Sequence, residues 1–358
     1  MNILIIQPFL SWGGAEAVSI QFANVLNKSG HRAKIICLYK TPLLPLGADK
    51  IKIVTPPRFV SDLFKNHKSL IIVLGFFVLL LLTINNSKKA DMVNPHNFPS
   101  LWVAVITARI RKVPVIWTVH NFPQSPFPAL TFLDKFFARQ CKSIVAVSEK
   151  VGKQIFKKYK VRSKIIYPGI DYTYWSGGKK IKRYGNNFVV VTAGRLKKDK
   201  NFDLAIEAFK IVSKNLKNAV LIIVGEGIEF ENIKQTAKNI ENVKLIGYQT
   251  PAQLRDWYKT ASLFVLPSYK TEGFNLTPFE ALCSAITPLV VKGSGADEAI
   301  LKNKIGIVSG RSAGEVSEAI YWVYKNQSNA YRMAKKGKLW VKNNLSWEEY
   351  VKRFQNLI

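Results

Sequence analysis

Two carboxylates follow an apolar run in the second half of the chain and stand where a loop leads into a helix. Leu263–Leu266 has the composition of a buried strand, and Glu272-Gly-Phe-Asn-Leu-Thr-Pro-Phe-Glu280 follows it. We predict a helix over Thr277–Cys283, because Pro278 suits a first helical turn that needs no amide donor. Free backbone N–H groups at such a helix start bind anions, and carboxylates accept hydrogen bonds from sugar hydroxyls. The amides concerned are those of Phe274, Asn275, Leu276 and Thr277. The segment therefore predicts a phosphate or diphosphate site, although the Glu-x7-Glu spacing alone is common on helix surfaces.

A basic loop is the second candidate for anion binding. The residues Ala193-Gly194-Arg195-Leu196-Lys197-Lys198-Asp199-Lys200-Asn201 follow an apolar strand and precede a helix predicted over Phe202–Lys214. Gly194 permits a tight exit from the strand. The planar guanidinium of Arg195 and the point charge of Lys200 can converge on a diphosphate. The alternative is a solvated basic loop in a lysine-rich protein.

Two further candidates follow predicted strands in the first half of the chain. The turn Trp12-Gly13-Gly14-Ala15-Glu16 has glycines that let a ligand approach the backbone, although any strand-to-helix turn can carry glycine. His120 ends an apolar strand, and His96 ends another and is a secondary candidate. Ligands of open α/β sheets bind at this rim, whereas a single histidine at a strand end is often structural.

The elements that must position these residues alternate between strands and helices. Asn2–Pro8 and Ala33–Leu38 have the pattern of parallel strands joined by a helix over Ala15–Lys28, which makes one βαβ unit. The polar, glycine-containing stretch 176–187 interrupts this pattern and is typical of a linker. We therefore expect an α/β protein with two Rossmann-like domains, over 1–175 and 188–345, each with a parallel sheet.

The composition excludes several classes of protein. The chain has 358 residues, of which 48% are hydrophobic, so it can bury a core and is not a disordered or low-complexity protein. Its formal net charge of +30 predicts a polyanionic partner, either nucleic acid, anionic lipid or a phosphorylated small molecule. The excess is concentrated in residues 1–180, which hold 26 basic and 7 acidic side chains.

Missing motifs narrow the chemistry further. Phe230 stands where a dinucleotide fingerprint would need its third glycine, so a nicotinamide enzyme is not expected. The sequence has no P-loop, no Asp-x-Asp pair and no His-x-x-x-His, so we expect no metal site, and the charge on a leaving diphosphate must be met by Arg, Lys and helix dipoles. Three distant cysteines favour a reducing compartment, and the N-terminus has the pattern of a strand, not of a signal peptide.

An uncharged apolar segment covers Leu70–Ile84. As a helix it would be about 23 Å long, at ~1.5 Å per residue, which is short of the ~30 Å hydrocarbon thickness of a bilayer. Crossing would also place the strands Asn2–Pro8 and Met92–Asn94 on opposite sides of the membrane, although one sheet needs both. Because basic residues flank the segment, we favour contact with one leaflet of an anionic membrane. The contacting residues would be Leu70, Phe76, Phe77 and Leu80. Burial in the core and an oligomer interface are the alternatives.

The sequence resembles the retaining nucleotide-sugar glycosyltransferases of family four, which have the GT-B fold. The resemblance extends over nearly the whole chain and is most specific at AGRLKKDKNFDLAIEAF (193–209), VGEG (224–227) and EGFNLTPFEAL (272–282). Supporting stretches are GGAE (13–16), PHNFPS (95–100), TVHN (118–121), VAVSE (145–149) and YPGID (167–171). It implies two Rossmann-like domains that face an interdomain cleft, the first binding the acceptor and the second the nucleotide. It also implies that 346–358 form a last helix that packs back on the first domain.

The resemblance assigns the donor to matching positions of the second half. Arg195 and Lys200 would hold the diphosphate, and Glu280 would accept hydrogen bonds from the ribose hydroxyls. The helix that starts near Thr277 would help the diphosphate to leave. Glu272 would hold the transferred sugar and phosphate together with the backbone amides of Gly273, Phe274, Asn275 and Leu276.

The resemblance also assigns two residues of the first half. Gly14 would close on the diphosphate, and His120 would lie against the sugar near the reacting carbon. The family is metal-independent, so neither a metal nor a cofactor is expected. Two stretches depart from the family pattern: Phe274-Asn275 replaces the usual Phe-Gly, which bears on donor-sugar identity, and CSAITP (283–288) replaces Ala-Cys-Gly-x-Pro.

The expected activity is transfer of a hexose from a UDP- or GDP-sugar to an acceptor hydroxyl, with retention through front-face displacement. The basic first half and the apolar segment favour a lipid-linked or membrane-surface glycan acceptor, used in the synthesis of cell-envelope glycans or glycolipids. The protein would then be cytoplasmic and attached peripherally or monotopically to the inner face of the cytoplasmic membrane. The alternative is a soluble GT-B transferase or synthase that uses a small sugar or sugar phosphate. A basic nucleic-acid-binding protein is a remote alternative, because the lysines are scattered without a nucleic-acid-binding motif.

Overall fold

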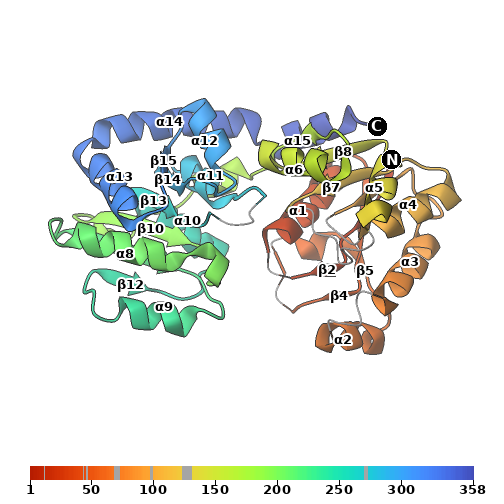
Figure 1. The fold of residues 1–358 in the computed structure, drawn as a ribbon, viewed down its shortest axis with the longest axis horizontal. Helices are drawn as coiled ribbons and strands as arrows, with labels where there is room; N and C mark the ends of the chain where they lie inside the picture. Colours follow the sequence, from red (N-terminus) through yellow and green to blue (C-terminus); the bar gives the residue numbers. More distant parts are fainter. Residues whose placement is uncertain are drawn as a thin grey trace. The chain divides into compact units, whose positions relative to one another are not determined.

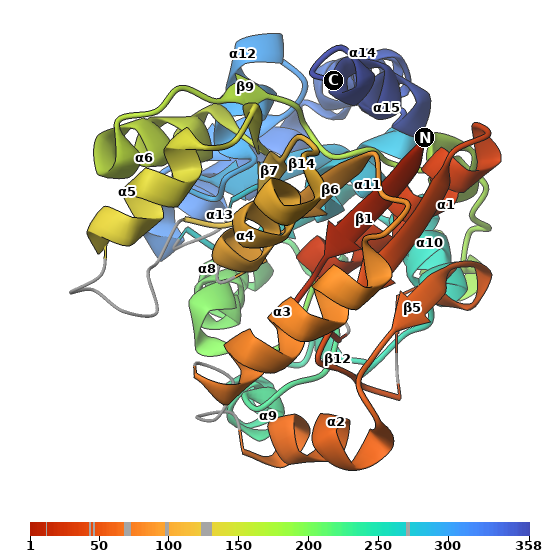
Figure 2. The same ribbon diagram turned by 90° about the vertical axis from the view of Figure 1, so that its right-hand side faces the viewer.

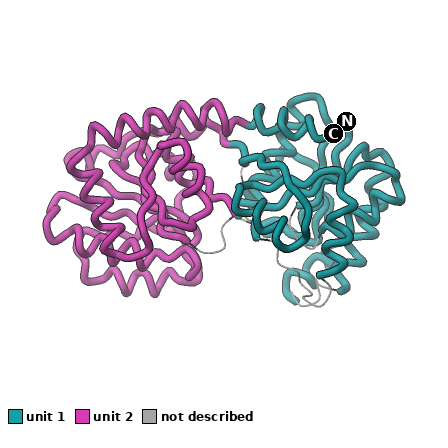
Figure 3. The backbone as a smooth tube through the Cα atoms, turned by 45° about the horizontal axis from the view of Figure 1, so that its top comes forward, with its two compact units in different colours: residues 1–169, 347–358 teal, residues 170–346 magenta. Residues whose placement is uncertain are grey.

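Two compact α/β units make up the described part of the chain. The computed structural model describes residues 1–11, 13–42, 44–45, 47–67, 73–96, 100–122, 131–269 and 273–358. The first unit consists of residues 1–169 with 347–358, and the second of residues 170–346 (Figure 3). Each unit is built on a parallel sheet with helices packed against it (Figure 1). We describe each unit by itself.

The sheet of the first unit is built in two stretches that meet side by side. Its strands are β1 (Asn2–Ile6), β2 (Phe9–Leu10), β3 (Arg32–Ile36), β4 (Tyr39–Lys40), β5 (Lys52–Val54), β6 (Met92–Pro95), β7 (Ile116–Val119), β8 (Ser143–Ala146) and β9 (Lys164–Ile165). The order is β5-β3-β1-β6 in one stretch and β7-β8-β9 in the other, and β2 pairs with β4. Parallel bridges between Val93 and Val115 and between His96 and Thr118 join β6 to β7.

Helices cover both faces of this sheet. They are α1 (Gly14–Lys28), α2 (Arg58–Asn66), α3 (Leu74–Asn86), α4 (Ser100–Arg111), α5 (Thr131–Arg139), α6 (Glu149–Tyr159) and α15 (Trp347–Gln355), with a short 3-10 turn at Ala48–Lys50. The last helix belongs to this unit because its aromatic side chains pack on α1. The ring of Phe22 meets those of Phe354 and Tyr350 edge to face, at 4.7 and 5.1 Å between centroids.

The second unit has one six-stranded sheet in the order β12-β11-β10-β13-β14-β15, with every pair parallel. Its strands are β10 (Phe188–Ala193), β11 (Ala219–Val224), β12 (Val243–Leu245), β13 (Leu263–Leu266), β14 (Thr287–Val291) and β15 (Ile307–Ser309). Its helices are α7 (Tyr172–Ser176), α8 (Phe202–Ser213), α9 (Phe230–Ala237), α10 (Pro251–Thr260), α11 (Thr277–Cys283), α12 (Asp297–Asn303), α13 (Ala313–Lys325) and α14 (Gln327–Asn344), with 3-10 turns at Lys182–Tyr184 and Lys198–Lys200. All residues of β10, β11, β13 and β14 are buried, which is why they form continuous apolar runs in the sequence.

Residues 170–187 belong to the second unit, although their composition predicted the end of the first domain and a linker. Side chains of α10 and of Ser284, the residue that follows α11, fix this stretch. The Lys179 N–H donates to Asp256 Oδ1 (2.7 Å), and the Ile181 N–H donates to Thr260 Oγ1 (2.9 Å). The Ser284 hydroxyl donates to the carbonyl of Trp175 (3.1 Å). A polar sequence thus becomes part of a compact unit because its backbone amides have side-chain acceptors.

An alanine closes helix α11 in a conformation that favours glycine. Ala285 has a φ of 58°. Its N–H donates to the carbonyl of Leu282, and the Ile286 N–H donates to the carbonyl of Ala281, which is the Schellman pattern of a helix C-cap. In the left-handed region a Cβ costs about 1–2 kcal/mol.

Replacing Ala285 by glycine should stabilise the second unit by about 1 kcal/mol, because removal of the strained Cβ outweighs the greater freedom of the unfolded chain. Chemical denaturation of the two proteins measures the difference. The matched control is Ala319→Gly in the middle of α13, which should lose about 1 kcal/mol. An Ala285→Gly protein that is less stable than the wild type would contradict this account of the C-cap.

Candidate active site

The loop after β10 carries the two cations predicted to bind a diphosphate. Arg195 follows the strand and is exposed, whereas Lys200 ends a 3-10 turn and is half-buried. Backbone hydrogen bonds fix this loop to the one that follows β11. The Gly194 N–H donates to the backbone carbonyl of Val224 (3.0 Å), and the Leu196 N–H donates to the backbone carbonyl of Glu226 (2.9 Å).

Two glycines of the VGEG motif allow this contact between backbones. A Cβ on Gly227 would lie 2.2 Å from the carbonyl oxygen of Leu196, and one on Gly225 would lie 1.9 Å from that of Gly194. Gly225 also has a φ of 142°. A larger residue at either position would push the loop of Arg195 away from the sheet. The VGEG motif thus has a structural role: its glycines allow the contact that holds the basic loop in place.

The second loop of the site follows β13, which is the parallel neighbour of β10. Because parallel strands end at the same edge of a sheet, the basic loop and the segment 273–280 leave from one edge. Glu272 lies outside the described residues. Gly273 is buried, and the ring of Phe274 stacks on that of Phe279 at 4.8 Å. Helix α11 begins at Thr277, as the sequence predicted.

One amide of this helix start differs from the prediction. The N–H and the hydroxyl of Thr277 both donate to Oδ1 of Asn275, at 3.2 and 2.8 Å. The expectation of a free Thr277 amide is therefore wrong for this structure, because the side chain two residues earlier accepts it. Asn275 is 7% exposed. The asparagine that replaces the family's usual glycine thus has a local role in shaping the loop.

A tyrosine supports the carboxyl group at the end of this segment. The hydroxyl of Tyr258, which is fully buried on α10, donates to Glu280 Oε2 at 3.1 Å. Burial raises the pKa of the Glu280 carboxyl to about 7, and the hydrogen bond from Tyr258 works in the opposite direction. Burial and the same carboxylate raise the pKa of Tyr258 well above its ordinary value. Near neutral pH the Glu280 side chain is thus close to its midpoint of titration.

The first unit places its candidates after neighbouring strands. β1 pairs with β6, and β6 is bridged to β7, so the strands that precede Gly14, His96 and His120 end at one edge of the sheet. Gly14 is the first residue of α1, and a Cβ there would meet no atom within 4 Å. Space for a close approach to the backbone is therefore open at this position.

The two histidines form a buried chain of hydrogen bonds with an asparagine. Asn94 Nδ2 donates to the carbonyl of Ile116 (2.5 Å) and to Thr118 Oγ1 (3.0 Å). Asn94 Oδ1 is 2.7 Å from His96 Nε2, and His96 Nδ1 is 2.8 Å from His120 Nε2. His96 is fully buried and His120 is 5% exposed.

This chain determines which ring nitrogens carry protons. A carbonyl can only accept, so the bond to Ile116 orients the Asn94 amide and leaves its Oδ1 to accept from His96 Nε2. Burial, together with the neighbouring His120, lowers the pKa of His96 well below its usual range, and burial lowers that of His120 to about 4. Both rings are therefore neutral at pH 7. His96 Nδ1 then accepts from His120 Nε2, which makes Nδ1 of His120 its acceptor nitrogen.

The apolar segment forms a surface helix. Helix α3 covers Leu74–Asn86, and Leu70 lies outside the described residues. Gly75, Leu79 and Thr83 are buried on one face, while Phe77 is exposed on the other. Phe76 and Leu80 are half-buried. The helix is thus neither fully buried in the core nor polar on its outer face.

Two kinds of feature are absent from the described residues. Within those ranges, no helix has both the length and the apolar content needed to cross a membrane. In the same part of the chain, no three side chains of His, Cys, Asp or Glu gather in a group that could hold a metal ion.

Sequence reasoning missed two supporting residues. Tyr258 fits the apolar periodicity of α10, so the sequence gave no sign that its hydroxyl reaches a carboxylate. Asn94 lies inside a four-residue strand, and a polar residue in a fully buried strand was the available signal. Each holds a candidate residue in place, and neither belongs to a motif named above.

Comparison with known proteins identifies the class and then the family. Each of the two Rossmann-like units matches one half of a GT-B glycosyltransferase. Residues 12–174 match the family model described as Glycosyltransferase Family 4, and residues 177–340 match Glycosyl transferases group 1. Together the two matches span nearly the whole chain. The chain belongs to the family-four glycosyltransferases of the GT-B fold.

Solved structures agree on the fold. Anabaena HepE in complex with UDP-glucose is similar with a TM-score of 0.79 and 17% identity, over 99% of this chain and 98% of that one. Staphylococcus aureus TarM, in a complex that includes UDP, is similar with a TM-score of 0.74 and 14% identity over 99% of both chains. At these identities the likeness concerns the fold.

Curated relatives are similar over varying lengths. An uncharacterized glycosyltransferase of Methanocaldococcus jannaschii is 26% identical over 63% of this chain and 60% of its own length. An uncharacterized glycosyltransferase of Haemophilus influenzae is 27% identical over 78% of this chain and 77% of its own length. The capsular polysaccharide glycosyltransferase CapM of S. aureus is 23% identical over 84% of both. Against several other relatives the chain spans about half their length.

The half-buried Glu280 side chain, whose carboxyl has a raised pKa, should make the stability of the second unit depend on pH. Its pKa is about 7 in the folded state and 4.5 ordinarily, so the folded state retains the proton longer. The stability associated with the protonated form is therefore complete below pH 4.5 and lost as the pH rises to about 7. Glu280→Gln should gain up to about 3 kcal/mol relative to the wild type between pH 4.5 and 7.5.

Denaturation curves of both proteins across this range measure the change. Tyr258→Phe provides a second check, because the lost hydrogen bond should raise the pKa of Glu280 and move the transition to higher pH. A stability difference between Glu280→Gln and wild type that stays constant with pH would contradict the burial of this carboxyl.

Proposed function

We propose that the protein transfers a hexose from a UDP- or GDP-sugar to an acceptor hydroxyl, with retention of anomeric configuration. The observation that carries this proposal is the pairing of β10 with β13, by which the loop of Arg195 and Lys200 and the segment that ends at Glu280 leave from one sheet edge. A diphosphate needs cations, and a ribose diol needs an acceptor carboxylate. Membership of the family and the UDP-glucose complex of HepE support a nucleotide-sugar donor.

In this proposal the second unit binds the donor. Arg195 and Lys200 hold the diphosphate and offset the charge that develops on it as it leaves, so the proposed reaction requires neither a metal nor a cofactor. Glu280 accepts hydrogen bonds from the ribose. Glu272 holds the transferred sugar with the backbone of Gly273, Phe274, Asn275 and Leu276 next to it, at the start of the helix that begins with Thr277.

Burial suits Glu280 to this role. A carboxyl with a pKa of about 7 is partly protonated at neutral pH, and a diol that donates hydrogen bonds favours its charged form. The ribose hydroxyls of the nucleotide would thus add hydrogen-bond donors to the Glu280 carboxylate, which in the protein alone accepts a hydrogen bond from Tyr258.

In the first unit, His120 is proposed to contact the transferred sugar near the reacting carbon. As a neutral ring with Nδ1 as its acceptor nitrogen, it can accept a hydrogen bond from a sugar hydroxyl. Gly14 would let the diphosphate approach the backbone of α1. The sequence offers no evident enzymic nucleophile, so we propose front-face displacement, in which the leaving phosphate takes the proton of the acceptor hydroxyl.

The proposed acceptor is a lipid-linked or membrane-surface glycan at the inner face of the cytoplasmic membrane. Several relatives have names that place them in envelope synthesis. They include a phosphatidylinositol monomannoside mannosyltransferase of Mycobacterium tuberculosis, which uses GDP-mannose, and a lipopolysaccharide N-acetylglucosaminetransferase of Salmonella typhimurium. The apolar outer face of α3, with Phe76, Phe77 and Leu80, supports contact with a membrane.

A screen of UDP-, GDP- and ADP-sugars, with and without lipid-linked acceptors, tests the proposal. We expect turnover of one UDP- or GDP-sugar, stimulated by the lipid-linked acceptor, and a product with the anomeric configuration of the donor by NMR. Glu280→Ala should weaken nucleotide binding by roughly tenfold or more, because a charged hydrogen-bond acceptor is lost. Glu272→Ala should lower turnover more than nucleotide binding.

The matched control is Glu318→Ala, which removes an exposed carboxylate of α13 and should change neither quantity. Full activity in both site variants would show that the site is wrongly assigned. Turnover with small sugar phosphates alone would favour the soluble alternative. Salt-sensitive DNA binding without any turnover would favour a nucleic-acid-binding protein.

His96 should act as a positioning residue for His120. His96→Leu removes the acceptor of the His120 Nε2 proton, so kcat/KM should fall by about tenfold or more and its pH profile should shift. His96→Gln keeps a side-chain oxygen for the same proton and should retain most of the activity.

Steady-state kinetics of both variants over a range of pH provide the measurement, and thermal melting confirms that both are folded. If glutamine and leucine reduce activity equally and leave the pH profile unchanged, His96 serves only to fill the core.

A further inference from the structure

Three neighbouring helices of the first unit present apolar residues to solvent. Helix α3 packs against α4, and α4 against α5, so that they form one layer on the sheet (Figure 2). Phe77 and Leu81 of α3 are 56% and 62% exposed, and Phe132 and Phe136 of α5 are 64% and 47% exposed. In each pair the residues are four apart and thus share one helix face. The outer face of such a layer is normally polar, so these residues indicate a partner that covers them.

Aromatic rings connect the exposed positions across the layer. We call these rings the aromatic strip: Phe77, Phe76, Trp102, Phe137 and Phe136, in spatial order. Successive centroids lie 5.3, 6.4, 5.5 and 5.5 Å apart, so the strip passes from α3 over α4 to α5. Trp102 Nε1 donates to Oδ1 of the buried Asp134 at 3.0 Å, which anchors the middle of the strip. Contacts between neighbouring rings and this hydrogen bond therefore hold the strip together.

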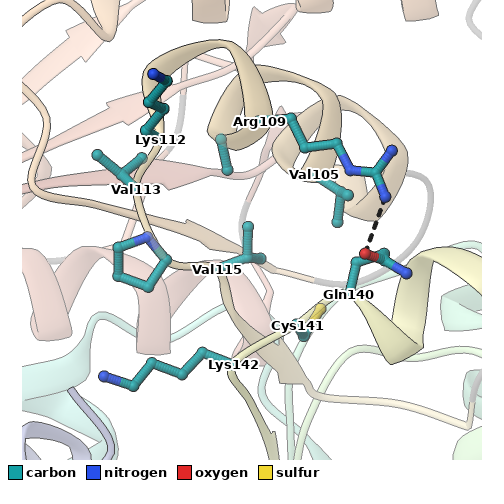
Figure 4. Close-up of a pocket in the computed structure, with 10 residues that line it drawn as sticks. Val105, Arg109, Lys112, Val113, Val115, Gln140, Cys141 and Lys142 are labelled. Carbon is teal, nitrogen blue, oxygen red and sulfur yellow. Dashed lines mark hydrogen bonds between the residues drawn. The ribbon is translucent and has the colours of Figure 1, made fainter.

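Cations gather at the C-terminal ends of α4 and α5. Arg109 lies over the ring of Phe136 at 5.6 Å and donates to Gln140 Oε1 at 2.9 Å. With Lys112 and Lys142 it lines a surface cavity of about 320 Å³ (Figure 4). Lys142 also donates to the main-chain oxygen of Ile358. A helix C-terminus attracts cations by itself. The stretch of sequence from which α3, α4 and α5 come is also basic, because residues 58–142 hold 11 basic and 3 acidic side chains.

We propose that the aromatic strip and these cations form one docking surface for an anionic phospholipid bilayer. The helices α3, α4 and α5 would lie in the plane of the membrane, with the rings at the level of the interface and with Arg109, Lys112 and Lys142 near lipid phosphates. This deepens the proposed function by naming the surface that brings the enzyme to a lipid-linked acceptor.

The charge distribution favours a bilayer over a second copy of the chain. A two-fold contact through this face would bring two surfaces with the same basic excess together, and like charges across an interface oppose binding. An anionic membrane satisfies both the apolar rings and the cations. Because α3 buries one face against the protein, it can rest on the membrane but cannot insert as a separate helix.

Vesicle flotation tests the proposal, with phosphatidylcholine alone and with phosphatidylcholine mixed with phosphatidylglycerol. The wild type should bind the anionic vesicles. Phe77→Glu/Phe136→Glu should reduce the binding at least tenfold, because it places two charges in the apolar contact. The matched control is Tyr331→Glu/Leu339→Glu on α14, where both side chains are 57% exposed, and it should bind like the wild type.

A second pair of charges tests the basic edge. Arg109→Gln/Lys112→Gln should lower the affinity for anionic vesicles by roughly fivefold for each charge removed, and binding should become less sensitive to salt. Unchanged vesicle binding by the strip variant would overturn the proposal. A wild type that does not bind vesicles but forms dimers that Phe77→Glu disrupts would also overturn the proposal.

Donor binding measured in the same proteins separates this inference from the proposed function. Lost vesicle binding with intact donor binding supports the docking surface. Intact vesicle binding without turnover of any donor would leave the surface standing and refute the transferase assignment.

Discussion

Parallel strand pairing is the constraint on which the candidate site depends. The backbone hydrogen bonds that join β10 to β13 make two loops, separated by about seventy residues of sequence, leave from one edge of the sheet. In the proposed site the first loop would supply cations and the second would supply carboxylates, so a nucleotide sugar would need both loops. Gly225 and Gly227 add a second restriction, since only a residue without a side chain lets the loop after β11 touch the backbone of the basic loop. The chemistry therefore depends on sheet register first and on side chains second.

Burial acts on the titratable groups of the two units in the same physical way but with different results. It disfavours charge, so His96 and His120 are neutral at pH 7, while Glu280 is held near its midpoint. In the proposed donor site of the second unit, the positive charge would come from Arg195, which is exposed, and from Lys200, which is half-buried. In the proposed function, the buried rings of the first unit would be held in a fixed geometry, and the cations of the second unit would attract the diphosphate.

The sequence predicted the elements that carry strong patterns and missed those that do not. The apolar run Leu263–Leu266 fixed β13 to the residue, and Pro278 in the first turn fixed the start of α11. The two-residue strands β2, β4 and β9 are too short for any periodic signal. Residues 176–187 have the composition of a linker, yet acceptors on α10 hold their amides, and such long-range partners are not encoded in local composition. The same limit explains why the hydrogen bonds from Thr277 to Asn275 and from Tyr258 to Glu280 became visible only in the structure.

The apolar segment 70–84 shows a further limit of prediction from sequence, which is that the sequence could not tell which face of its helix is buried. A helix that is apolar all round has no preferred face in sequence, so only packing could show that α3 buries Leu79 and exposes Phe77. Full burial of one phenylalanine contributes about 1.5–3 kcal/mol, and each cation near an anionic surface about 1 kcal/mol. On the proposed docking surface, a few such contacts, reduced by the cost of orienting the protein, would give reversible binding to a membrane and not permanent anchorage. Reversible binding is what a transferase needs when its donor is dissolved in water and its acceptor stays in the bilayer.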